Sequence, residues 1–189
     1  MRIQLTQRAE ADELLGRSPL ALLVGMMLDQ QVPLEWAFTG PYTISERLGH
    51  ELTAEEMASY DPEAFTALLA AKPAVHRYPK SMAARVQQLA AYLVEHYDGN
   101  PERIWAEVPD GKELLKRLQD LPGYGKQKAQ IFLALLGKQL GVQPPGWREA
   151  AGPYGEEGSF RSVADVVDAD SLERVRAAKQ AAKQAAKAN

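Results

Sequence analysis

The chain has 189 residues, of which 46% are hydrophobic and 25% are charged, a balance typical of a soluble globular protein. The absence of cysteine excludes disulfides, zinc–thiolate sites and a cysteine-ligated iron–sulfur cluster, and three scattered histidines predict no metal site. The net charge of −3 argues against a generally basic nucleic-acid-binding protein. With no apolar segment long enough for a bilayer and no signal peptide, we expect a cytoplasmic protein with no membrane partner. A monomer is the simplest expectation, because the sequence leaves the oligomeric state open.

Helical periodicity dominates and no segment reads securely as a strand, which predicts an all-α protein of one domain over residues 1–189. Ser18 before Pro19 is a typical helix start, and the apolar run that follows predicts a buried helix. Gly40 and Pro41 are expected to end the next helix. In chain order, the expected helices are 20–28, 33–39, 43–48, 53–59, 63–71, 81–97, 101–107, 112–118, 124–140 and 170–187. Residues 142–158, rich in proline and glycine, are expected to form a long functional loop.

The most informative segment is 121–129, where a proline ends one helix and two glycines precede a new apolar-periodic run. We expect both glycines to use left-handed backbone angles in a tight turn. Such a turn leaves backbone N–H groups free at the positive end of a helix dipole, where phosphate binds. The pattern predicts a helix-hairpin-helix over 112–140 that grips a nucleic-acid backbone without reading sequence. The alternative is a plain helix–turn–helix corner. The expected DNA contacts are Gly123, Tyr124, Gly125, Lys126 and Lys128.

Charge is distributed unevenly along the chain. Residues 112–138 and 171–189 each carry a net charge of +4, so the remainder carries −11. This polarity predicts a basic face toward DNA and an acidic back toward solvent. The last helix places basic residues at three- and four-residue spacing, and a simple solvated helix face is the alternative there.

Three segments together resemble the helix-hairpin-helix (HhH-GPD) DNA glycosylase superfamily. Segment 121–129 is similar to the family hairpin, 28–31 to an early helix that ends in a pair of glutamines, and 78–86 to a helix that begins with a lysine and small residues. The resemblance covers roughly residues 20–141 and implies a two-lobed all-α fold. It also implies base excision repair by cleavage of the N-glycosidic bond of a flipped base in double-stranded DNA.

The chain departs from the family pattern at its catalytic positions. Pro145 occupies the place, counted from the hairpin, where the family carries a catalytic Asp, and Gln127 replaces the lysine of the lyase members. A monofunctional glycosylase is therefore expected. Its candidate carboxylates are Asp168 (with Asp165 second), Asp29 and Glu149. The alternative for Asp168 is a helix cap, and for Asp29 a buried carboxylate paired with an arginine.

The resemblance implies further site residues and one ion. The base pocket is expected to use Gln30, Gln31, Trp36, Tyr78, Trp147 and Tyr154. The alternative for each aromatic residue of this set is an ordinary place in the hydrophobic core. His76 and Arg77 are expected to reach a phosphate, and a monovalent cation to bind the hairpin carbonyls, with no other cofactor. Two further readings stay open: a non-catalytic binding module for damaged or structured DNA, and a protein-interaction domain whose basic tail docks an acidic partner.

Overall fold

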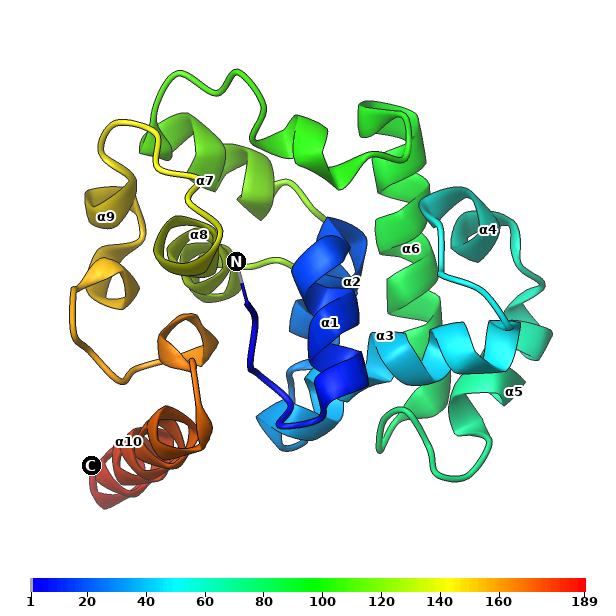
Figure 1. Ribbon diagram of the computed structural model, residues 1–189, viewed down its shortest axis with the longest axis horizontal. Coiled ribbons are helices and arrows are strands. Elements are labelled where there is room, and N and C mark those ends of the chain that lie inside the picture. Colours follow the sequence, from blue (N-terminus) through cyan, green and yellow to red (C-terminus); the bar gives the residue numbers. More distant parts are fainter. Residues whose placement is uncertain (1) are drawn as a thin grey trace.

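The computed structural model describes residues 2–189 and confirms the all-α class, with no strand among those residues (Figure 1). Three short 3₁₀ helices, labelled η, complete the elements. The elements in chain order are α1 (Ala9–Arg17), α2 (Pro19–Leu28), α3 (Leu34–Leu48), α4 (Ala54–Ser59), α5 (Pro62–Ala70), α6 (Pro79–Tyr97), η1 (Pro101–Ile104), α7 (Gly111–Gln119), α8 (Lys126–Gln139), α9 (Trp147–Ala150), η2 (Gly152–Gly155), η3 (Val163–Asp165) and α10 (Ala169–Ala188).

The helices form two groups with α1 and α2 between them (Figure 1). One group contains α3 to α6, and the other contains α7 to α10 around α8. As its apolar run predicts, α2 is buried from Leu20 to Leu28. Its start follows the sequence signal, because the Ser18 side chain accepts a hydrogen bond from the Ala21 N–H ahead of the apolar run. The end of this central helix is where the candidate site is built.

The expected break at Gly40 and Pro41 is wrong, because α3 runs without interruption through both residues. Proline removes one helical hydrogen bond, but packing decides the outcome here. A Cβ added at Gly40 would lie only 2.5 Å from Leu28 Cδ1, so the glycine lets α3 lie close against α2. The helix instead ends at Gly49, which has a φ of +82°.

The expected loop 142–158 contains the short helices α9 and η2 and contributes to the core. Trp147, predicted to line a base pocket, is 8% exposed. A Cβ added at Gly137 would lie 2.4 Å from its ring, so α8 is shaped to receive the indole. Trp147 is therefore a core residue, and its assignment to a base pocket is wrong.

Candidate nucleic-acid interface

The hairpin connects α7 and α8 as the sequence predicts, with a different role for each glycine. Asp110 begins α7 by accepting a hydrogen bond from the Glu113 N–H at 2.8 Å. Gly123 has a φ of +81°, whereas Gly125 is extended, with a φ of −70°. Left-handed geometry was thus predicted correctly only for Gly123. Gly125 is the N-cap residue of α8. It has no side chain that could accept a hydrogen bond from the first N–H groups of that helix.

Two hairpin side chains predicted to bind DNA instead hold the hairpin against α2. The Tyr124 hydroxyl donates a hydrogen bond to the Leu23 carbonyl at 2.5 Å, and burial raises the pKa of this tyrosine well above its usual value. The Lys128 Nζ donates to the carbonyls of Met26 at 2.7 Å and Met27 at 3.3 Å. Both assignments to DNA are therefore corrected. The exposed hairpin residues are Gly123, Gly125, Lys126 and Gln127.

Asp29 lies at the end of α2, next to the carbonyls that Lys128 binds. Its side chain is only 10% exposed, and Lys179 Nζ lies 3.9 Å from its Oδ2. Burial raises the pKa of Asp29, although Lys179 and Lys128 act in the opposite direction. Burial likewise lowers the pKa of Lys128 to about 8, opposed by Asp29. The end of α2 thus holds one carboxylate between two amines in a largely desolvated environment.

Asp29 borders a groove of about 910 Å³ between the segment 29–34 and one face of α10, with Arg77 at its edge. Gln31 is exposed, lines this groove and has a φ of +61°. Gln30 lines it too, but its amide is engaged: Nε2 donates to the Met27 carbonyl at 2.8 Å and Oε1 accepts from Arg85 at 2.9 Å. Outside α10, Gln31 and Arg77 are therefore the polar groove residues whose side chains are exposed.

His76 is fully buried and cannot reach a phosphate, so that prediction is wrong. The Tyr78 N–H donates to His76 Nδ1 at 3.0 Å, which makes Nε2 the protonated nitrogen that donates to the Gln30 carbonyl at 2.9 Å. Burial lowers the pKa of His76, in keeping with a neutral ring. The histidine fastens the loop before α6 to the segment that carries Asp29, and this contact places Arg77 at the groove.

The predicted aromatic residues do not gather around Asp29, and none of the groove-lining residues within 2–189 is aromatic. Trp36 donates from Nε1 to the Ala74 carbonyl at 2.9 Å and borders a separate hollow. Tyr78 is 48% exposed at the start of α6. Tyr154 is half-buried, and its hydroxyl accepts a hydrogen bond from Gln127 at 2.9 Å, so it lies over the hairpin.

The other candidate carboxylates are used elsewhere in the fold. Asp168 is the exposed cap of α10, where its Oδ1 accepts from the Ser171 N–H at 2.7 Å, and this bond lowers its pKa. Asp165 pairs with Lys138 at 2.6 Å. Glu149 is exposed beside a different hollow, near Asp110. None of these three lines the groove that Asp29 borders, and the helix-cap alternative holds for Asp168.

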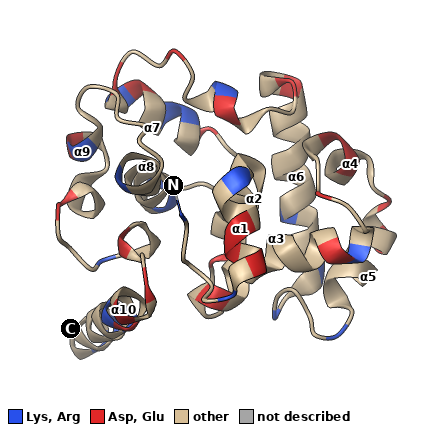
Figure 2. Cartoon of the chain, viewed as in Figure 1, with Lys and Arg blue, Asp and Glu red and all other residues tan. Residues whose placement is uncertain are grey.

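Sequence reasoning did not select Arg85, Lys179, Arg176 and Glu35 for this region. Arg85 contacts Gln30, and Lys179 approaches Asp29. Arg176 of α10 pairs with Glu35 of α3. The basic spacing in the last helix was the available signal for Lys179 and Arg176. Figure 2 shows basic residues on α7, α8 and α10, and acidic residues on α1 and α4. Acidic residues also lie on α7 and α10 and a basic residue on α1, so the figure shows no clean separation into a basic and an acidic face.

Comparison with known families gives a match over most of this architecture. The model of the HhH-GPD superfamily base excision DNA repair protein matches residues 24–189, which include α8, the groove and α10. The chain belongs to the HhH-GPD superfamily. No curated protein and no solved structure matches the chain. Membership gives this HhH-GPD protein a role in DNA repair and implies that it binds DNA. Among residues 2–189, no helix is long and apolar enough to cross a membrane.

Proposed function

We propose that this HhH-GPD protein is a monofunctional DNA glycosylase that acts on double-stranded DNA with Asp29 as its reactive carboxylate. One observation carries the proposal: of the candidate carboxylates, Asp29 alone combines a nearly buried side chain with a place on the large groove. The hairpin is bonded to the middle of α2 through Tyr124 and to the end of α2 next to Asp29 through Lys128. A phosphate held at the hairpin would therefore lie on a strand close to Asp29.

The chemistry follows from these positions. The target nucleotide leaves the stack at a cost of roughly a few kcal/mol and enters the groove. As the bond from C1′ to the base nitrogen breaks, the base leaves with the bonding electron pair, positive charge develops on the sugar, and the Asp29 carboxylate stabilises it. Water then bonds to C1′ and gives up a proton, which Asp29 is suited to accept because burial raises its pKa. Gln31 and Arg77 border the groove and supply polar contacts to the base or the gap it leaves.

The monofunctional assignment rests on the amines near the hairpin. Gln127, whose amide cannot form a Schiff base, stands where lyase members carry lysine, and it donates to Tyr154. Lys128 has an amine, but two carbonyls at the end of α2 hold its Nζ. Hydrolysis by water requires no organic cofactor. A monovalent cation on the hairpin carbonyls, a monomeric state and a cytoplasmic location belong to the same proposal.

The decisive experiment uses duplexes that each carry one damaged or mismatched base. Alkali after incubation cuts the strand at any abasic site, and an identical reaction without alkali tests for lyase activity. We expect scission only after alkali, lost in Asp29→Asn and retained in the matched variants Asp168→Asn and Glu149→Gln. Because the folded state already disfavours the charged form of Asp29, the neutral Asn should leave the melting temperature unchanged or raise it. Scission retained in Asp29→Asn contradicts the assignment.

A second function is favoured by a specific observation: the groove lacks an aromatic residue for stacking a base, and Pro145 replaces the family's catalytic Asp. A chain with these features could bind damaged or structured DNA without cutting it. In that case no duplex of the panel is cut after alkali, while binding remains steeply dependent on salt and requires Lys126.

A further inference from the structure

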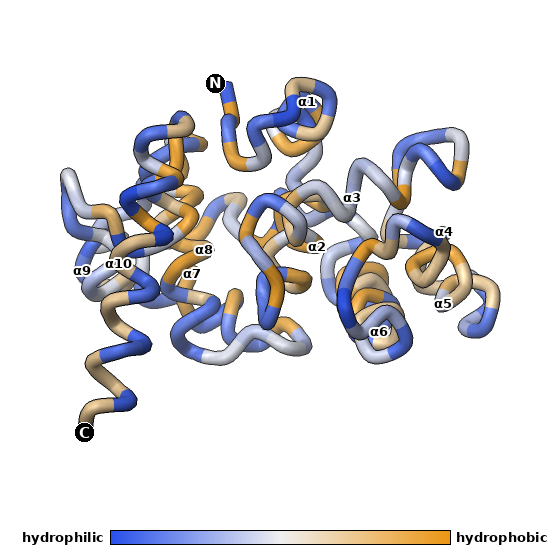
Figure 3. Tube along the Cα trace, turned by 90° about the horizontal axis from the view of Figure 1, so that it is seen from below, coloured by the Kyte–Doolittle hydropathy of each residue, from blue (hydrophilic) through white to orange (hydrophobic). Residues whose placement is uncertain are grey.

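The last helix continues well beyond the part of it that packs on the protein. Leu172 and Val175 are its last two buried apolar residues, and Arg176 and Lys179 pair with Glu35 and Asp29. Residues 180–189 are all exposed, and in the described chain their side chains make no hydrogen bond or ion pair. Figure 3 shows this half of α10 projecting from the body of the molecule. We call residues 179–188 the arm.

The composition of the arm suits a polyanion and no apolar partner. After Val175 the helix contains no hydrophobic side chain larger than alanine, so it has no apolar face to bury. After Glu173 the chain has no acidic residue, while Lys179, Lys183 and Lys187 recur every four residues and so share one face. All three lysines line the groove that Asp29 borders. The same face therefore carries positive charge from the candidate reaction site outward.

We propose that the arm binds the phosphate backbone of the duplex beside the nucleotide that enters the groove. This inference rests on the proposed function, because it takes the groove as the place of the flipped base. Eight residues separate Lys179 from Lys187, or about 12 Å of helix. Phosphates of one strand are about 3.4 Å apart along the duplex axis, so the arm covers roughly three or four of them.

Attachment of the arm at Asp29 gives it a specific role. Lys179 forms the inner end of the lysine row and also lies 3.9 Å from Asp29. A strand bound along the arm is consequently directed toward the carboxylate. Lys183 and Lys187, the lysines of the outer arm, touch no reacting atom. Their removal should therefore raise the KM for a cleaved duplex and leave kcat unchanged. An acidic protein partner would leave duplex binding independent of the arm.

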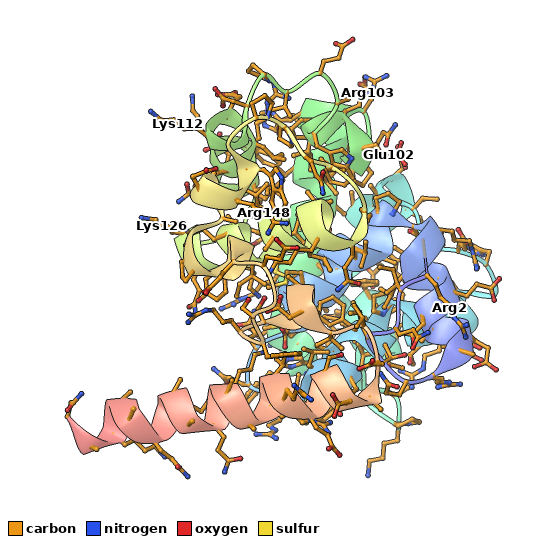
Figure 4. All side chains as sticks on the ribbon, turned by 60° about the vertical axis from the view of Figure 1, so that its left-hand side comes forward. Arg2, Glu102, Arg103, Lys112, Lys126 and Arg148 are labelled. Carbon is orange, nitrogen blue, oxygen red and sulfur yellow. The ribbon has the colours of Figure 1, made fainter. Side chains whose placement is uncertain are left out.

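The test compares two double variants that remove the same charge. Lys183→Gln with Lys187→Gln alters the outer arm, and Arg2→Gln with Arg103→Gln is the control. Figure 4 shows Arg2 and Arg103 on the side of the molecule away from the free end of α10. A chain that ends at Lys179 is the second arm variant. Since residues 180–189 are exposed, all arm variants should have the melting temperature of the wild type.

The readout is the affinity for a labelled, undamaged duplex between about 50 and 200 mM salt. Each lost phosphate contact lowers the slope of log K against log[salt] by about 0.9, so the double arm variant should lose about 1.8. At about 0.1 M salt this corresponds to a loss of affinity on the order of tenfold to 100-fold. The control double variant should keep the wild-type slope.

The outcomes separate this inference from the proposed glycosylase. A wild type that binds the duplex with a slope equal to that of both arm variants overturns the arm and leaves the glycosylase proposal standing. Binding that depends on the arm, without scission of any duplex, supports the arm and opposes the glycosylase. A wild type that does not bind duplex DNA overturns both.

Discussion

Lys128 should make the stability of this protein rise with pH across the mildly alkaline range. Burial lowers the pKa of its amine from the ordinary 10.5 to about 8, and Nζ is held by the Met26 and Met27 carbonyls. Below about pH 8 both the folded and the unfolded chain carry the proton, so the folded state bears the full cost of the buried charge. Between pH 8 and 10.5 the folded state has released the proton while the unfolded state keeps it. The unfolded chain then binds more protons, so the free energy of unfolding increases with pH.

The magnitude follows from the two pKa values of Lys128. Their difference corresponds to about 3 kcal/mol in total, of which about 1 kcal/mol is regained between pH 7 and pH 9. The folded value near 8 places the start of the rise within a range where urea unfolding is readily measured. Lys128→Met keeps an unbranched side chain of similar length and removes the titrating amine.

The assay is urea unfolding of the wild type and Lys128→Met at pH 7, 8 and 9. Groups common to both proteins cancel in the difference between their free energies of unfolding. We expect this difference to move in favour of the wild type by about 1 kcal/mol from pH 7 to pH 9. Parallel pH dependences would refute the reasoning, because they would mean that Lys128 keeps an ordinary pKa in the folded protein.

Three further changes have definite expected outcomes. Asp168→Ala should lower the melting temperature by removing the α10 cap while alkali-dependent scission remains, and scission lost at equal stability would return Asp168 to the site. Gln139→Leu leaves the Ala164 and Val166 carbonyls without their donor, so urea unfolding should show a loss of about 1–3 kcal/mol; an unchanged midpoint would contradict this. Lys126→Gln should reduce the salt slope of duplex binding by about 0.9, and an unchanged slope would remove Lys126 from the interface.

The sequence alone predicted the helical class, the hairpin and the family, because each rests on local chemistry. Ser18 caps the helix that it was predicted to begin, and the apolar run after Pro19 is the buried α2. The proline and glycines of segment 121–129 likewise encode a turn through their own backbone preferences, because proline ends a helix and glycine accepts a positive φ. Such signals act within a few residues, so they can be read along one chain.

Tertiary structure decided which side chains of those motifs are exposed and which are bonded within the protein. Lys126 and Lys128 look equivalent in sequence, but the carbonyl of Met26, 102 residues before Lys128, binds the second and leaves the first exposed. The same holds for Tyr124, whose hydroxyl donates to Leu23. Asp29 stands out from Asp168 only through its burial between α8 and α10. Burial and pairing depend on residues distant in the chain, and no local pattern contains them.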